Sequence, residues 1–161
     1  MEPLLNSRWG FDSSCFVCEA SNADGLRIPF HHDAENRRVV AEFALDERFS
    51  GAPSYVHGGI VLAVLDEAMA WATIAVAGVF AVTKETTTRF RRPVHVGARY
   101  EVRGWVEEDG DVLRCGAEVL DEAGERCSVA SATFVPLGPA QAADAVGTEV
   151  TGADREFLRD P

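Results

Sequence analysis

The sequence is poor in basic residues, and lysine is almost absent. Among its 161 residues are 26 acidic and 15 basic ones, which give a formal net charge of −11, and Lys84 is the only lysine. Proteins that bind nucleic acid generally present a basic surface, so this charge excludes a general nucleic-acid-binding function. Hydrophobic residues make up 47% of the chain and charged residues 25%, which is the balance of a globular domain with a core.

Several motifs that mark enzyme sites are also missing. There is no Walker glycine loop, no Rossmann glycine fingerprint, no H-E-x-x-H pair and no G-x-S-x-G nucleophile elbow, and we expect no cofactor. The opening MEPLLNSRWGFDSSCF lacks the basic stretch and apolar run of a signal peptide, so we expect a cytoplasmic protein.

Four cysteines are present, and only two of them form a C-x-x-C pair. These two are Cys15 and Cys18, whereas Cys115 and Cys127 lie about a hundred residues further on. A structural zinc site needs four ligands, which usually come from two such pairs. We therefore interpret the cysteines as buried or half-buried thiols and expect no metal site; a site built from all four cysteines is the alternative.

Hydrophobic patterning predicts two strands, one long helix and four further strands. The strands are expected at residues 26–32, 37–45, 81–92, 98–106, 112–120 and 125–135, and the helix at 59–77. Short connections favour antiparallel neighbours, and a curved sheet can bury an apolar helix by wrapping around it, so we predict an α+β fold. Residues 1–10 are expected to be a loose lead-in, 11–137 the domain, and 138–161 a flexible acidic tail with a helical turn near 153–159.

The segment HGGIVLAVLDEAMAW, which starts at His57, is almost wholly apolar but carries adjacent carboxylates at Asp66 and Glu67. A membrane helix is disfavoured, because each central carboxylate would cost roughly 2.5–3.5 kcal/mol. A helix buried by the sheet fits the pattern better. An unpaired ionised carboxylate is strongly disfavoured in a core. The two acids therefore either pair or cap at an exposed edge of the helix, or one of them is a catalytic base or nucleophile.

The helix is preceded by His57, Gly58 and Gly59. Glycines allow a close approach to the backbone, and free N–H groups at a helix start can hold the oxygen of a polarised carbonyl. The alternative is an ordinary glycine-rich turn. Asp66 lies eight residues beyond Gly58, about 12 Å along the helix at about 1.5 Å per residue, so one helix cannot apply both groups to one carbonyl. They can meet only where antiparallel helices of two subunits lie side by side, which predicts a two-fold dimer with two shared sites.

These residues resemble a known family. The motif His57-Gly58-Gly59, with Asp66 nine residues after the histidine and a strand ending Phe90-Arg91-Arg92-Pro93 before Gly97, is similar to hotdog-fold acyl-CoA thioesterases of the phenylacetic-acid-degradation (PaaI-like) type. The opening Cys15–Cys18 with Asn22–Leu26 also looks like that group's lead-in, although Glu19 and Ala23 stand where glycine and proline are usual. The likeness spans residues 11–137.

The resemblance implies a hotdog fold, in which a curved antiparallel sheet wraps one long central helix, and a homodimer or homotetramer. It implies hydrolysis of acyl-CoA, with Asp66 as base or nucleophile, the Gly58 N–H polarising the carbonyl across the dimer interface, and His57 positioning the thioester or the helix start. Glu67 has no counterpart there. Further substrate-binding candidates are Gly59, Asn22, Phe90 and Thr73, although Thr73 more simply packs on the sheet.

Basic residues gather in one window of this acidic chain. Residues 84–103 carry a net charge of +4, whereas the remainder carries −15. Arginine makes bidentate contacts to phosphate, so we predict that at least one of Arg89, Arg91 and Arg92 contacts the phosphates of CoA. A solvated strand face is the alternative.

Other functions remain compatible with the sequence. A hotdog protein can bind acyl-CoA in a regulatory role without catalysis, and a thioesterase can act on an acyl carrier protein instead of CoA. A hotdog hydratase would need a closely spaced histidine–acid pair, which this sequence lacks. The acyl group is not identified by any residue pattern.

Overall fold

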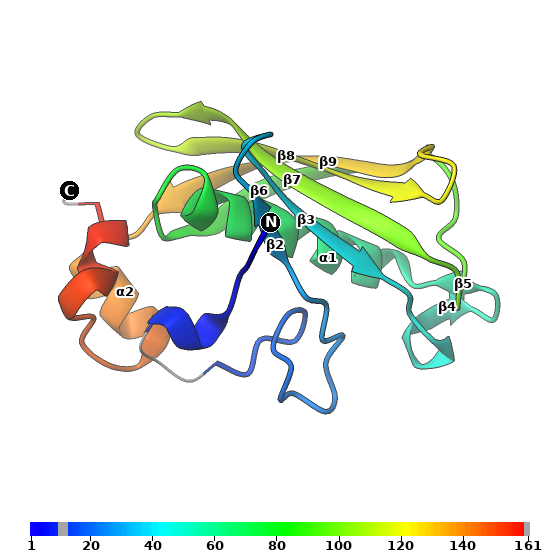
Figure 1. The fold of residues 1–161 in the computed structure, drawn as a ribbon, viewed down its shortest axis with the longest axis horizontal. Helices are drawn as coiled ribbons and strands as arrows, with labels where there is room; N and C mark the ends of the chain where they lie inside the picture. The colour runs from blue at the N-terminus through cyan, green and yellow to red at the C-terminus, as the bar shows by residue number, and fades with distance from the viewer. Residues whose placement is uncertain (10–12, 160–161) are drawn as a thin grey trace.

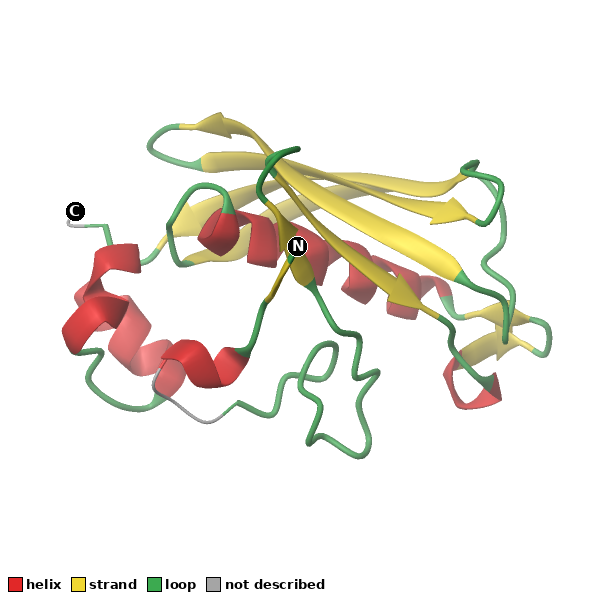
Figure 2. Cartoon of the chain, viewed as in Figure 1, coloured by secondary structure: helices red, strands yellow, loops and turns green. Residues whose placement is uncertain are grey.

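The computed structural model describes residues 1–9 and 13–159, and in this part of the chain a long helix lies against one face of a seven-stranded sheet (Figure 1, Figure 2). The helix is α1, Gly58–Ala75. The strands are β1 (Glu2–Pro3), β2 (His31–Asp33), β3 (Arg38–Phe43), β6 (Ala81–Phe90), β7 (Tyr100–Asp109), β8 (Leu113–Asp121) and β9 (Arg126–Pro136). They lie in the order β1-β2-β3-β7-β8-β9-β6, and neighbouring strands are antiparallel.

The predicted α+β class is confirmed, as is the sheet packed on one central helix. Along β7 the burial alternates as predicted: Tyr100, Val102 and Gly104 are buried and the residues between them are half-buried, because successive side chains of a strand point to opposite faces. On β8, residues Leu113, Cys115, Ala117 and Val119 are each at most 1% exposed and belong to the core. β7 continues three residues beyond the expected end at Val106, through a bulge between Val106 and Glu108, so the turn to β8 comes later than predicted.

The expected strand at 26–32 is wrong for its first five residues. Only the last part of that segment forms a strand, β2, because Arg27 has a φ of 54° and this left-handed backbone interrupts an extended chain. Leu26 and Ile28 are nevertheless buried. Their N–H groups donate to the carbonyls of Phe16 (2.7 Å) and Val17 (2.9 Å), so this segment is bonded to residues 13–19 instead of to the sheet.

Both ends of the chain contain regular structure. The expected lead-in forms β1 and the short helix η1 (Asn6–Trp9), and the expected tail contains α2 (Pro139–Val146) and η3 (Gly152–Phe157), the latter near the predicted helical turn. η3 is attached to the domain, since the Phe80 N–H donates to the carbonyl of Phe157 (2.7 Å) and the two rings contact each other. The expected boundary between residues 10 and 11, and residues 160–161 of the tail, lie outside the described residues.

Small connecting elements complete the chain before α1. The short helix η2 (Glu47–Phe49) leads into a two-stranded sheet of β4 (Ser50–Ala52) and β5 (Tyr55–Val56). The N–H of Val56 donates to the carbonyl of Val94 (2.8 Å), which joins this small sheet to the segment that follows β6. The start of α1 is therefore fixed beside the end of β6.

α1 is the core helix of a globular domain. By length and composition alone it could cross a membrane. It is instead covered by the sheet, and Val64, Leu65, Ala68, Met69 and Ala72 are fully buried. β7 lies close to the backbone of α1 at Gly104, where a Cβ would lie 2.6 Å from the carbonyl carbon of Ala68.

We predict that Gly104→Ala destabilises the fold, because the added methyl group has no room between β7 and the backbone of α1. Overpacking of this kind lowers the free energy of unfolding by about 1–3 kcal/mol. Urea denaturation of the variant and the parent measures the change. Gly110→Ala is the matched control, since a Cβ there would have its nearest neighbour at 3.7 Å. Equal losses for the two variants would contradict this account of the contact.

Candidate active site

The first turn of α1 is capped in a way that leaves one N–H group unused. His57 is the N-cap, and its Nδ1 accepts a hydrogen bond from the Gly59 N–H at 2.9 Å. The carbonyl of His57 accepts from the N–H groups of Ile60 and Val61. Within the described part of the chain, the Gly58 N–H has no hydrogen-bond acceptor. A free donor therefore stands at the positive end of the helix dipole.

Gly58 lines a hollow of about 320 Å³ at this end of the helix. The remaining walls come from β5, the end of β6, residues 91–94 and β9. The ring of Phe90 is 55% exposed, and a Cβ on Gly58 would lie 3.7 Å from it, so Gly58 is open to an incoming group. Four residues that the sequence analysis selected line this hollow: Gly58, Phe90, Arg91 and Arg92.

Ser128 on β9 also lines this hollow, and the sequence analysis did not select it. Its side chain is fully buried, and its Oγ has no hydrogen-bond partner among the described residues. Ser128 lies opposite Phe90 in the ladder between β6 and β9. No motif in the sequence marks this serine, because its position depends on the pairing of strands that are 38 residues apart.

The three arginines selected from the sequence have different surroundings. Arg92 is paired with carboxylates, Glu125 at 3.2 Å and Asp121 at 3.8 Å. Arg91 lines the hollow without an ion pair to any described residue, and Arg89 is exposed on β6 and does not line the hollow. The guanidinium of Arg91 is therefore the best placed of the three for an anion at the hollow.

Asp66 lies away from this hollow and is held by a residue of the edge strand. The Oγ1 of Thr83 on β6 donates a hydrogen bond of 2.8 Å to Oδ1 of the half-buried Asp66. The separation of about 12 Å between Asp66 and Gly58, which follows from the rise of one continuous helix, therefore stands. The sequence analysis missed Thr83, which is one of four threonines in β6 and is distinguished only by its place beside α1.

Glu67 points in another direction and has different neighbours. Adjacent helix residues point about 100° apart, and Glu67 contacts the N-terminal segment instead of β6. The thiol of Cys15 donates to Glu67 Oε1 at 3.3 Å. Burial raises the pKa of Glu67 to about 8. The two adjacent carboxylates thus belong to separate sites.

Two other candidates are used structurally. The amide of Asn22 shapes the turn before Gly25: its Oδ1 accepts from the Asp24 N–H (3.1 Å) and its Nδ2 donates to the Ser14 carbonyl (2.9 Å). Thr73 is fully buried, and its hydroxyl donates to the carbonyl of Ala70 in the same helix (2.8 Å). The structure brings neither residue to the hollow at Gly58.

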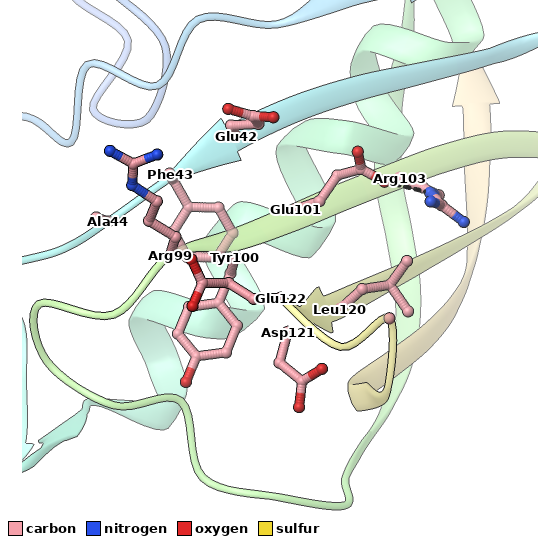
Figure 3. A pocket seen from close by; sticks show the side chains of 11 residues that line it. Glu42, Phe43, Ala44, Arg99, Tyr100, Glu101, Arg103, Leu120, Asp121 and Glu122 are labelled. Carbon is pink, nitrogen blue, oxygen red and sulfur yellow. Dashed lines mark hydrogen bonds and ion pairs between the residues drawn. The ribbon is translucent and has the colours of Figure 1, made fainter.

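A larger hollow, of about 610 Å³, lies on the far face of the sheet over β3, β7 and β8 (Figure 3). It is lined by charged side chains such as Glu42, Glu101, Arg103 and Asp121, and Glu101 and Arg103 form an ion pair there. None of the residues selected from the sequence lines it. The smaller hollow, with its free backbone donor, is therefore the candidate active site.

Comparison with protein families matches residues 54–128 to the thioesterase superfamily. This segment starts before α1 and ends in β9, so it contains Gly58, Asp66, Arg91 and Ser128. A search of curated protein sequences gave no match.

Several solved structures share the fold. A thioesterase superfamily protein is 22% identical, with a TM-score of 0.71 over 79% of this chain and 67% of that chain. The PaaI protein from the phenylacetic acid degradation operon of E. coli is 19% identical, with a TM-score of 0.57 over 61% of this chain and 75% of its own. A Streptococcus mutans protein bound to acetyl-CoA is 18% identical, with a TM-score of 0.60 over 63% and 82%.

The matched segment contains the central helix and most of the strands that bury it, and the structural relatives share this architecture at low identity. The chain therefore has a hotdog-like fold, and its residues 54–128 are similar to the thioesterase superfamily.

Proposed function

We propose that this protein is a thioester hydrolase that cleaves acyl-CoA to a free acid and CoA. The observation that carries the proposal is the unused N–H of Gly58, a residue that lines a hollow together with an unpaired arginine, Arg91. Such a donor can hold the oxygen of a thioester carbonyl and stabilise the negative charge that develops on it. The match of residues 54–128 to the thioesterase superfamily supports the same chemistry. So do two structural relatives, one bound to acetyl-CoA and one crystallised with CoA.

In this proposal, Asp66 supplies the second half of the reaction. Its carboxylate either removes a proton from a water molecule that attacks the carbonyl carbon, or attacks that carbon itself; in both routes the C–S bond breaks and CoA leaves as a thiolate. In the second route the acyl group is left on Asp66 as an anhydride, which water then hydrolyses to release the acid and regenerate the carboxylate. Thr83 orients the carboxylate through its hydrogen bond. His57 acts on the oxyanion donor indirectly, because its cap fixes the backbone of Gly58 and Gly59.

The site is proposed to form between two copies of the chain. Gly58 and Asp66 are about 12 Å apart on one helix, so each carbonyl would be held by Gly58 of one subunit and attacked by Asp66 of the other. β6 supports this arrangement, since it ends the sheet and its outer edge pairs with no strand among the described residues. An exposed ten-residue edge strand is a template for pairing with another chain.

A cytoplasmic location belongs to the same proposal. All four cysteines are free thiols, which is usual in a reducing compartment.

Asp66→Asn should abolish most of the hydrolysis, because the amide can act neither as base nor as nucleophile. Removing a general base typically costs roughly 10²–10⁴-fold in rate. Thiol release from short, medium, long and aryl acyl-CoAs measures the loss, with blanks for the protein's own cysteines. Asp144→Asn, on the exposed side of α2, is the control and should keep the parent's rate.

The same assay separates the alternatives. A parent protein that binds acyl-CoA tightly without turnover would be a regulatory binding protein. Turnover confined to an acyl carrier protein ester would change the substrate class and keep the chemistry.

Gly58→Pro should remove the oxyanion donor without breaking the helix. Proline lacks the N–H and is favoured at the first helical position, and His57, with φ −59° and ψ 133°, already has the backbone conformation that a following proline requires. We expect a fall in kcat of about 100-fold, as for loss of an oxyanion-hole donor in other hydrolases. Gly58→Ala keeps the N–H and is the matched control.

Mixing the two inactive variants tests the shared site. A dimer of one Asp66→Asn chain and one Gly58→Pro chain contains one intact site if the groups come from opposite subunits. Random pairing would then restore about a quarter of the parent's activity. No restoration in a mixture shown to exchange subunits would contradict the shared site.

Arg91→Ala should raise KM for acyl-CoA by about 10-fold, because a charge-assisted contact to phosphate contributes about 1.5–3 kcal/mol and part of this is lost to solvent screening. Arg92→Ala should have a smaller effect, since Glu125 and Asp121 already neutralise Arg92. Steady-state kinetics with acyl-pantetheine, which carries no phosphate, provides the internal control. A KM change of the same size for both substrates would rule out a phosphate contact.

A further inference from the structure

The side chains of Cys15, Cys18 and Glu67 converge on one point, away from the hollow at Gly58. Their ligand atoms, two sulfurs and one carboxylate oxygen, all lie within 4.8 Å of one another. Cys15 Sγ lies 3.3 Å from Glu67 Oε1. The cysteines belong to the segment before β2, whereas Glu67 lies in the middle of α1, so the cluster joins two distant parts of the chain.

The donor set and its spacing fit a zinc ion. Zinc binds thiolates at about 2.3 Å and carboxylate oxygens at about 2.0–2.2 Å, so ligand atoms around a tetrahedral zinc are about 3.6–3.8 Å apart. Atoms that already lie within 4.8 Å reach these separations by small side-chain rotations. Magnesium and calcium prefer sets made only of oxygen, which disfavours them here.

No basic side chain neutralises the carboxylate of this cluster in the described structure. Among the described residues, neither lysine nor arginine forms an ion pair with Glu67.

A neighbouring side chain, Asn6, holds one of the cysteines of this cluster in place by a hydrogen bond. The side-chain amide of Asn6 donates to Cys18 Sγ at 3.3 Å and to Glu19 Oε2 at 3.1 Å. Hydrogen bonds of this kind orient the ligands of metal sites and stabilise the charge on coordinated sulfur. Asn6 lies in η1, so the N-terminal helix also contacts the cluster.

We propose that Cys15, Cys18 and Glu67 bind one zinc ion per chain, with a water molecule as the fourth ligand. Binding displaces to solvent the protons that these three groups carry and involves no oxidation. The ion would attach residues 13–19 to α1, one residue from Asp66. The sequence analysis expected no metal site, or one with all four cysteines; Cys115 and Cys127 join no such group of ligands in the described structure. This proposal does not depend on the thioesterase activity.

The competing chemistry of a C-x-x-C pair is a disulfide. A Cys15–Cys18 disulfide needs an external oxidant and would leave the half-buried Glu67 without its thiol partner. The convergence of a third ligand atom therefore favours the metal.

Cobalt binding to the full-length protein tests the site directly. Chelator-treated protein, purified without air, is titrated with Co²⁺, and the cobalt–thiolate absorption is followed. We expect one equivalent per chain, displaced by Zn²⁺. Cys15→Ser and Glu67→Gln should each weaken binding by at least about 100-fold, since even the loss of a residue that supports a ligand costs about 10–100-fold. Cys127→Ala, a thiol outside the cluster, and Asp66→Asn should bind like the parent.

A second readout covers the case in which a variant fails to fold. The Tm of the parent should rise with the logarithm of the free zinc concentration and fall again with chelator, as expected for a ligand of the folded state. The proposal is overturned if cobalt gives no stoichiometric thiolate absorption. It is also overturned if Cys127→Ala loses binding as Cys15→Ser does, or if mass spectrometry of the anaerobic protein finds a Cys15–Cys18 disulfide.

Discussion

Everything in this structure depends on the burial of one apolar helix. α1 is covered along one side by β7, β8, β9 and β3, and the small residues Gly104 and Ala68 let the sheet approach it. Close packing against these strands prevents the helix from rotating or sliding, because protein interiors are packed as densely as organic crystals. The directions of all its polar side chains are therefore fixed together, and so is the exposure of its first turn.

This constraint explains how two adjacent carboxylates are tolerated in an apolar helix. Neither is fully buried, and the 100° between them sends Asp66 towards β6 and Glu67 towards the N-terminal segment. Asp66 finds a hydroxyl donor in Thr83, whereas Glu67 finds thiols and a raised pKa of about 8. One apolar helix can therefore carry the carboxylate proposed for hydrolysis and the carboxylate proposed as a metal ligand in separate environments.

The sequence predicted the fold well, because the fold depends on local patterns, and it selected four of the residues that line the hollow at Gly58. Alternating residues gave the strands, and the glycines at 58 and 59 gave the open start of α1. Contacts between segments that are distant in the sequence could not be predicted from it. Examples are Ser128 beside Phe90, Thr83 beside Asp66 and Cys15 beside Glu67. The ion pair between Arg92 and Glu125 distinguishes Arg92 from the unpaired Arg91. It could not be predicted either, because it depends on the turn between β8 and β9.

The geometry of β6 links assembly to the proposed chemistry. Along this strand, Thr83 lies beside Asp66 and Phe90 lies beside Gly58, so the strand runs antiparallel to α1. If two copies pair their β6 edges antiparallel about a two-fold axis between these residues, Thr83 of one copy comes opposite Phe90 of the other. Each Asp66 is then carried towards the other copy's Gly58, across the distance that a single helix cannot close. In this arrangement the edge strand would complete the site, and the proposed activity would require the dimer, because a single subunit cannot apply both its Gly58 donor and its Asp66 carboxylate to one carbonyl.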